Sequence, residues 1–276
     1  MTWSLRPEQL RAARKLRWIH SPAAAVHALM IPEIVAGDVV VTNARDVHGP
    51  VVAEHVIALV LALAKRLPSA FRYQQQSLWA QGQIWRESPH PREIAGATLG
   101  LVGLGSIGLE TAKRAAGLGM KVIAVREHAD QATEPSVVKV FGPNELDQML
   151  QASDYVVLAA PLTPRTRALI NHERLRQMKP DAYLINVSRG ALLDQAALLD
   201  ALRQHRIAGA ALDVFEQEPL PPDSPLWRTE NMVITPHTAA LTDKLWERHY
   251  TLLSENLRRF LAGAPLLNVV DKKRGY

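Results

Sequence analysis

The chain has 276 residues, of which 47% are hydrophobic and 21% are charged, and it contains no cysteine. A chain of this length and composition can bury a large core in one large or two modest domains, which excludes an intrinsically disordered protein. The absence of cysteine excludes disulfide bonds, cysteine-ligated zinc and cysteine nucleophiles, and it fits a reducing cytoplasm. We therefore predict a globular cytoplasmic protein and predict no metal site.

The formal net charge is +5 and the isoelectric point lies near 9.6. The basic residues are scattered, apart from small groups at Arg11–Arg17 and Lys272–Arg274, so solvated helix faces and a small anionic ligand explain the excess better than nucleic acid does. The longest apolar stretch, Val56–Ala64, is far shorter than the ~20 residues of a membrane span, and the N-terminus lacks the apolar core of a signal peptide. We predict neither a nucleic-acid partner nor a membrane partner.

The first 50 residues predict a small α/β segment. An amphipathic helix is expected at Pro7–Arg17, followed by short strands at Leu16–Ile19 and Asp38–Val41. The stretch His20–Val26 between these strands has the pattern of a loop that leads into a helix N-terminus.

A long apolar helix is predicted at Pro50–Leu67, with a proline in its first turn and Pro68 ending it. Residues 69–97, which follow, are more polar. Because the helix is apolar on nearly every side, it must be covered by its own domain and by a partner subunit. The sequence therefore predicts a homodimer.

A βαβ unit with a glycine-rich turn follows. The short apolar run Leu99–Val102 predicts a buried parallel strand, and it leads directly into the glycine-rich stretch Gly103–Gly108. A helical pattern then runs to Gly117, and Lys121–Val125 predicts a second strand. Three glycines spaced GxGxxG between a strand and a helix are the mark of a dinucleotide site.

Each glycine of this turn has a separate expected role. Gly103 permits the tight turn, Gly105 lets the backbone approach a pyrophosphate, and Gly108 lets the helix pack closely on the strand. The amides near Ser106 and Ile107 then face the phosphates from the positive end of the helix. We predict that the cofactor is NAD or NADP.

The residues after the second strand of this unit bear on the choice between the two. An acidic residue there holds the ribose 2′-hydroxyl of NAD, whereas an arginine accommodates the 2′-phosphate of NADP. The sequence places Arg126 there, followed at once by Glu127, which can repel the phosphate or take the hydroxyl itself. Arg126 favours NADP(H), and Glu127 keeps NAD open.

The rest of the chain alternates strands with helices. Such alternation predicts a doubly wound parallel α/β sheet. Its strands are expected at Val137–Phe141, Tyr155–Ala159, Tyr183–Val187, Ala208–Leu212 and Met232–Thr235, with helices at Asn144–Gln151 and Gln195–Gln204. A helix at Leu241–Ala262 and a tail ending near Val270 close the chain.

Polar groups follow three of these strands. Arg189, Glu218 and His237 lie at strand carboxyl ends, where ligands bind in open α/β sheets. Taken singly, they have ordinary structural explanations: a surface cation, an exposed loop acid and a core histidine. Together, the three residues predict reduction of a 2-oxo acid. The arginine can bind the substrate carboxylate, and the acid can orient the histidine and favour its charged form. His237 would protonate the carbonyl oxygen as hydride reaches the carbon.

These stretches resemble the signatures of the D-isomer-specific 2-hydroxyacid dehydrogenases. The resemblance runs from about residue 15 to the C-terminus and is carried by GLGSIG, PLT at 161–163, NVSRG at 186–190, DVFEQEPLP at 213–221 and TPHTA at 235–239. It implies Arg189, Glu218 and His237 as the catalytic set, and a substrate carboxylate bound by Arg189 and by amides near Ala24 and Ala25. It also implies a cofactor site lined by Ala160, Pro161, Val187, Asp213, His237 and Ala239, with Asp213 on the nicotinamide amide.

The resemblance also implies a domain plan. Residues 48–238 would form the dinucleotide-binding Rossmann domain, and residues 1–47 a smaller flavodoxin-like substrate domain to which residues 239–276 return. Family members usually begin with two further βα units, so the substrate domain is expected to be truncated and to keep only the strands near Leu16 and Asp38. The family's members are commonly dimers built on the long helix.

Three functions remain open at this point. The first is NAD(P)-dependent interconversion of a 2-oxo acid and a D-2-hydroxy acid. The second keeps this chemistry but moves the substrate to glyoxylate and hydroxypyruvate, or to a phosphorylated hydroxy acid. The third is a truncated, catalytically weak protein that only binds or senses a nucleotide. The intact set of Arg189, Glu218 and His237 favours an enzyme.

Overall fold

The computed structural model describes residues 1–129, 134–273 and 275, which fall into two compact units. The larger unit is Pro50–Ala240, and the smaller unit combines Met1–Gly49 with Leu241–Tyr276. No helix in the described part of the chain is long and apolar enough to cross a membrane.

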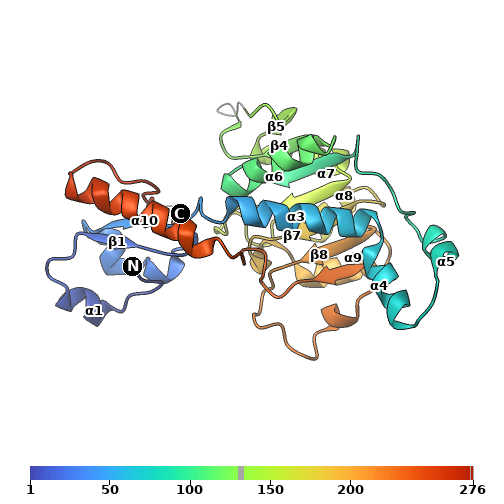
Figure 1. Ribbon diagram of the computed structural model, residues 1–276, viewed down its shortest axis with the longest axis horizontal. Coiled ribbons are helices and arrows are strands. Elements are labelled where there is room, and N and C mark those ends of the chain that lie inside the picture. Colours follow the sequence, from blue (N-terminus) through green and yellow to red (C-terminus); the bar gives the residue numbers. More distant parts are fainter. Residues whose placement is uncertain (130–133, 274, 276) are drawn as a thin grey trace. The chain divides into compact units, whose positions relative to one another are not determined.

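The larger unit is built on a seven-stranded parallel sheet with the order β5-β4-β3-β6-β7-β8-β9 (Figure 1). Its strands are β3 (Thr98–Val102), β4 (Lys121–Val125), β5 (Lys139–Phe141), β6 (Tyr155–Leu158), β7 (Tyr183–Asn186), β8 (Gly209–Leu212) and β9 (Met232–Ile234). The chain moves outward from β3 in one direction through β4 and β5, and then in the other direction from β6 onward. This order confirms the predicted doubly wound Rossmann sheet, with its switch point between β3 and β6.

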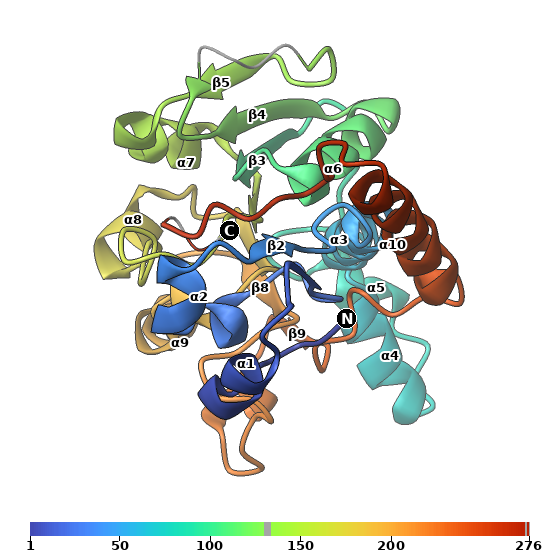
Figure 2. The same ribbon diagram turned by 90° about the vertical axis from the view of Figure 1, so that its left-hand side faces the viewer.

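Helices cover both faces of this sheet, as Figures 1 and 2 show. They are α3 (Gly49–Ala64), α6 (Ser106–Gly117), α7 (Leu146–Ala152), α8 (His172–Gln177) and α9 (Gln195–Arg203). Alternate strand residues face opposite layers, because side chains alternate along a strand: Val157 packs with α3 and α6, whereas Val156 packs with α7, α8 and α9. Both faces are therefore buried, which explains the uninterrupted apolar runs of the strands.

The predicted long helix is shorter than expected at its C-terminal end. Helix α3 stops at Ala64, and Arg66 adopts a left-handed conformation with φ of 56°. The prediction that Pro68 ends the helix is wrong, because Pro68 lies in the first turn of α4 (Leu67–Gln75), where proline is well tolerated. The polar stretch that follows also contains α5 (Gln81–Trp85).

Buried arginine contacts hold the break after α3 in place. Nε of Arg66 donates to Glu87 over 2.5 Å, and its Nη1 lies 3.3 Å from the Tyr183 hydroxyl. Arg66 is itself buried, so these bonds satisfy a guanidinium that has little access to water. The left-handed backbone at Arg66 is thus supported by tertiary contacts rather than by local sequence preference.

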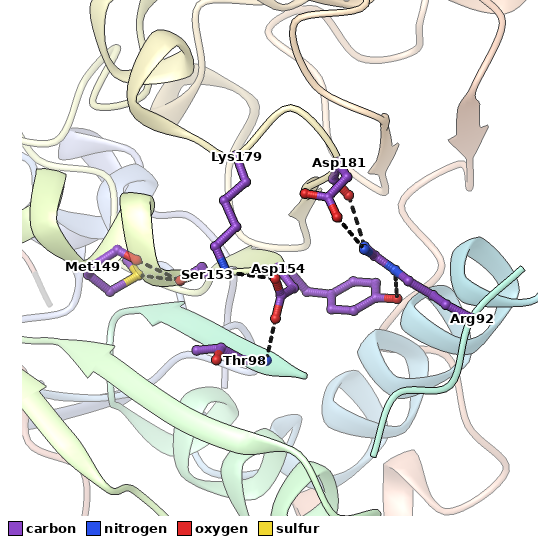
Figure 3. A network of polar contacts seen from close by, with 8 residues as sticks. Arg92, Thr98, Met149, Ser153, Asp154, Lys179 and Asp181 are labelled. Atoms are coloured by element: carbon purple, nitrogen blue, oxygen red, sulfur yellow. Dashed lines mark hydrogen bonds and ion pairs between the residues drawn. The ribbon is translucent and has the colours of Figure 1, made fainter. Parts of the chain in front are cut away.

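A polar network ties the amino ends of the strands together (Figure 3). Arg92 donates to the Tyr155 hydroxyl over 3.1 Å and to Asp181 over 3.1 Å, while its guanidinium stacks on the Tyr155 ring. Asp154 accepts bonds from Lys179 and from the first amide of β3, each over 2.7 Å. The network lies at the amino-end edge of the sheet. The candidate functional residues lie at the opposite edge, at the carboxyl ends of the strands.

The smaller unit contains a two-stranded parallel sheet of β1 (Trp18–His20) and β2 (Val40–Thr42). The tail of the chain joins it through an antiparallel bridge between Thr42 and Val269. Ile19, Val41 and Val270 share one small apolar core. The helices of this unit are α1 (Pro7–Ala12), α2 (Pro32–Ala36) and α10 (Leu245–Leu261), with a 3₁₀ turn at His27–Leu29.

Two helix boundaries in the smaller unit differ from those predicted. Helix α1 ends at Ala12 rather than Arg17, because the chain turns at Ala13 to enter β1. Helix α10 begins at Leu245 rather than Leu241, since the Thr242 hydroxyl accepts a hydrogen bond from the Lys244 amide and forms a turn there. Side-chain turns of this kind compete with helix formation.

Candidate active site

The glycine-rich turn lies between β3 and α6, and two of its glycines are required by the fold itself. Gly103 has φ of +102°, and a Cβ atom there would lie 2.7 Å from the Ala159 carbonyl oxygen. A Cβ atom at Gly108 would clash with the Gly103 carbonyl group. Gly103 therefore permits the turn and Gly108 the close contact of helix and strand, as the motif predicts.

Gly105 is different, because a Cβ atom at this position would meet no atom within 4 Å. Its backbone is extended, with φ of −88° and ψ of −160°, which any residue can adopt. Neither packing nor conformation in the protein itself thus calls for glycine here. The open space lies at the N-terminus of α6, which no side chain caps, so backbone amides there can bind phosphate oxygens. This cradle fits the pyrophosphate of a dinucleotide.

Substituting Gly105→Ala separates folding from ligand binding. We expect the variant to melt at nearly the parent temperature and to bind NADPH and NADH at least about tenfold more weakly, because the methyl group fills the space for the phosphates. Gly117→Ala is the matched control, since a Cβ atom there also meets nothing within 4 Å but lies at the far end of α6. Melting curves and fluorescence titrations make the comparison, and equal affinities in both variants contradict a role for Gly105.

Charged residues follow β4 at the position that the sequence predicts to contact the ribose. The Arg126 amide donates to the Phe141 carbonyl over 3.1 Å, which continues the pairing of β4 with β5. Glu127 forms a 2.5 Å salt bridge with Arg165, a residue of the loop after β6. The acidic charge that argued against NADP therefore has a cationic neighbour.

Asp213, directly after β8, organises the loop that follows β9. Its carboxylate is buried and accepts three hydrogen bonds, from the Thr235 hydroxyl over 2.6 Å and from the amides of Thr238 and Ala239 over 2.9 and 3.1 Å. The amide of His237 donates to the Asp213 carbonyl over 2.9 Å. The loop thereby holds His237 in a left-handed conformation with φ of 54°.

His237 and Glu218 form a close pair. Nδ1 of His237 lies 2.6 Å from Oε2 of Glu218, and the other oxygen of Glu218 accepts the Phe215 amide over 2.9 Å. The carboxylate is thus fixed through both oxygens and orients the imidazole, leaving the other ring nitrogen, Nε2, for a substrate. About half of the His237 side chain is exposed, so a ligand can reach it.

Arg189 lies near this pair, in the loop after β7. Burial lowers the pKa of its guanidinium, and the carboxylate of Glu218 opposes that effect. Its Nη1 donates to the Ser188 carbonyl over 2.6 Å. The Ser188 hydroxyl in turn donates to the Ala160 carbonyl over 2.5 Å, so the loop that carries Arg189 is joined to the loop that carries Ala160 and Pro161.

His55 also contacts residues of this site, although the sequence predicted no role for it there. It projects from α3, and its Nε2 lies 3.1 Å from the Thr235 hydroxyl and 3.8 Å from Oδ1 of Asp213. The sequence signal was the Ala-Glu-His stretch inside an otherwise apolar helix, since a polar residue on such a helix calls for a partner.

Ala24 and Ala25 lie in the smaller unit, in a loop held by its own neighbours. The Ala24 carbonyl accepts a 2.7 Å bond from the side chain of Asn43, and the Ala23 carbonyl accepts one from the Ala44 amide. Both alanines are partly exposed. Two carbonyl groups of this loop are therefore engaged within the smaller unit.

The chain is similar to known proteins over most of its length. Residues 57–239 match the family model described as D-isomer specific 2-hydroxyacid dehydrogenase, NAD binding domain. The chain belongs to this family.

Relatives of this dehydrogenase include enzymes with curated names and solved structures. A glyoxylate reductase of Korarchaeum cryptofilum is 37% identical over 271 residues, which are 96% of this chain and 79% of the relative. The structure of a D-isomer specific 2-hydroxyacid dehydrogenase of Xanthobacter autotrophicus Py2, in complex with NADPH and MES, is 36% identical, with a TM-score of 0.85 over 99% of this chain and 84% of that one. An NADPH-dependent glyoxylate/hydroxypyruvate reductase of Sinorhizobium meliloti, in complex with NADP and sulfate, is 29% identical, with a TM-score of 0.85 over 100% of this chain and 85% of that one. Together these matches identify an NAD(P)-dependent oxidoreductase.

Proposed function

We propose that this dehydrogenase reduces a small 2-oxo acid to the D-2-hydroxy acid, with His237 as the proton donor. The 2.6 Å contact between His237 and Glu218, at the carboxyl edge of the sheet that also carries the glycine-rich turn, supports this proposal most directly. When bound, a reduced nicotinamide dinucleotide supplies the hydride. Nε2 of His237 then gives its proton to the carbonyl oxygen, and Glu218 holds the imidazole through Nδ1. In the reverse direction, neutral His237 accepts the hydroxyl proton.

Arg189 and the loop at Ala24 and Ala25 are proposed to hold the substrate carboxylate. A guanidinium matches a carboxylate with two parallel hydrogen bonds, and a partly buried guanidinium is not fully solvated before the substrate arrives. Ala160, Pro161, Val187, Asp213 and Ala239 are proposed to line the cofactor site, with Asp213 near the nicotinamide amide. In this proposal residues 48–238 bind the dinucleotide, and residues 1–47 with 239–276 bind the substrate.

Steady-state reduction of a panel of 2-oxo acids tests the proposal. The panel contains glyoxylate, hydroxypyruvate, pyruvate and a phosphorylated 2-oxo acid, each assayed with NADPH and with NADH by loss of absorbance of the reduced cofactor. We expect turnover of glyoxylate or hydroxypyruvate, because no additional cation lies in the Ser21–Val26 loop to bind a phosphate. The alternative function, nucleotide sensing without catalysis, is not favoured, because relatives of this chain bear the names of reductases. Cofactor binding without turnover of any substrate would revive that alternative.

NADP(H) is the proposed cofactor, because Arg126 occupies the ribose-reading position. We expect the parent protein to bind NADPH more tightly than NADH by a modest factor. Arg126→Asp should reverse the order, since a carboxylate accepts the 2′-hydroxyl and repels the 2′-phosphate. Fluorescence titration with each cofactor measures the ratio. An equal loss of affinity for both cofactors would show that Arg126 does not contact the ribose.

A homodimer is proposed on α3. Several residues of this helix stay exposed or partly exposed within the chain, although they are apolar: Val51, Ile57, Ala58 and Leu61. Such a stripe suits a second copy of the helix. We expect light scattering to give twice the mass of the chain, and Ala58→Arg to give a monomer that remains folded, because Ala58 is already exposed within the chain. A parent protein of monomer mass at micromolar concentration contradicts the proposal.

A further inference from the structure

A salt bridge joins the carboxyl ends of the two strands that flank β3. Glu127 follows β4, Arg165 lies in the loop after β6, and Nη2 of Arg165 is 2.5 Å from Oε1 of Glu127. Between them β3 leads into the glycine-rich turn through Gly103. The pair therefore spans the sheet beside the turn that is proposed to hold the cofactor phosphates.

The charges at this place bear on which dinucleotide can bind. Arg126, which precedes Glu127, attracts a 2′-phosphate, whereas an isolated carboxylate next to it repels the phosphate and accepts a 2′-hydroxyl. The guanidinium of Arg165 offsets the charge of Glu127 and also occupies one of its oxygens. Among the charges of Arg126, Glu127 and Arg165, two are positive and one is negative.

We propose that Arg165 determines cofactor specificity by neutralising Glu127, so that the site accepts the 2′-phosphate of NADP(H). This inference rests on the proposed function only in that a nicotinamide dinucleotide binds at the glycine-rich turn. Arg165 acts through Glu127 and is a positioning residue rather than a catalytic one. Its side chain is 78% exposed and that of Glu127 is 37% exposed, so solvent and salt screen the pair and the effect is moderate in size.

A double-mutant cycle tests the inference through binding alone. The dissociation constants of NADPH and NADH are measured by fluorescence titration for the parent, Arg165→Ala, Glu127→Gln and the double variant. Arg165→Ala should reduce the preference for NADPH over NADH about fivefold, the effect of restoring one repulsive charge near a surface. The double variant should return to the parent ratio, because no carboxylate remains to repel the phosphate.

Arg167→Ala is the matched control, because Arg167 is an exposed arginine of the same loop and its removal changes the net charge equally. We expect this variant to keep the parent ratio. An unchanged ratio in Arg165→Ala overturns the inference, and so does a double variant whose ratio stays as low as that of Arg165→Ala.

The two proposals fail in different ways. The titrations contain no 2-oxo acid, so an inactive protein that still binds both dinucleotides leaves the role of Arg165 measurable. A parent protein that binds neither dinucleotide overturns both the proposed function and this inference.

Discussion

Replacing His237 with alanine is expected to lower kcat for reduction of a 2-oxo acid by about 10²–10⁴-fold, the usual worth of a general acid. The imidazole is the proton donor that Glu218 orients, and its removal leaves only water to protonate the oxygen. The affinity for NADPH should change little, because the glycine-rich turn and α6 are untouched. Steady-state kinetics and cofactor titration on the same preparation separate these two quantities.

His172→Ala is the matched control for this variant. His172 is an exposed histidine at the start of α8, so its loss changes composition equally and should leave kcat at the parent value. A His237→Ala variant that loses cofactor affinity while keeping kcat would assign His237 a binding role instead. The mechanism proposed here would then be wrong.

Gly190→Ala is expected to cost about 10²-fold or more in kcat/KM, although Gly190 has no side chain that could take part in the chemistry. A Cβ atom there would overlap the main chain of Phe215 and Glu216, so the backbone of the loop after β8 would have to shift. The Phe215 amide holds Glu218, and Arg189 precedes the substituted residue, so the shift disturbs both partners of the chemistry. Displacements on the order of 1 Å in a catalytic site have effects of this size.

Gly142→Ala controls for the general cost of adding a methyl group to a glycine. A Cβ atom at this position would make an ordinary 3.6 Å contact with the side chain of Glu145, so parent-like activity is expected. Melting curves of both variants show whether Gly190→Ala remains folded, and overpacking should lower its melting temperature. A folded Gly190→Ala variant with parent kcat/KM would mean that the loops after β7 and β8 do not act together.

The sequence predicted the larger unit well because its signals are local or follow from topology. A buried run followed by GxGxxG predicts strand, turn and helix, and parallel strands bring their carboxyl ends to one edge. That rule alone placed Arg189, Glu218 and His237 at the same edge of the sheet. Their pairing distances and the role of each oxygen of Glu218 required the three-dimensional structure.

Features that depend on contacts between residues far apart in the chain could not be predicted from the sequence. Pro68 suggests a helix end because proline disfavours a preceding helical residue, yet the same residue also fits the first turn of a new helix. The choice depended on Arg66, whose left-handed backbone is supported by Glu87 and Tyr183. No local pattern reveals that support, and the same holds for the contact between His55 and Thr235.

The arginine contacts at the amino ends of the strands suggest how sequences of this kind can diverge. Arg66 and Arg92 fasten both ends of the segment that carries α4 and α5 to the hydroxyl groups of Tyr183 and Tyr155. Those tyrosines begin their strands, whereas the chemistry is proposed at the opposite ends. Mutations on the outer surface of that segment can therefore accumulate without displacing the residues of the proposed chemistry. The surface of that segment and the substrate range thus become separately evolvable traits of one sheet.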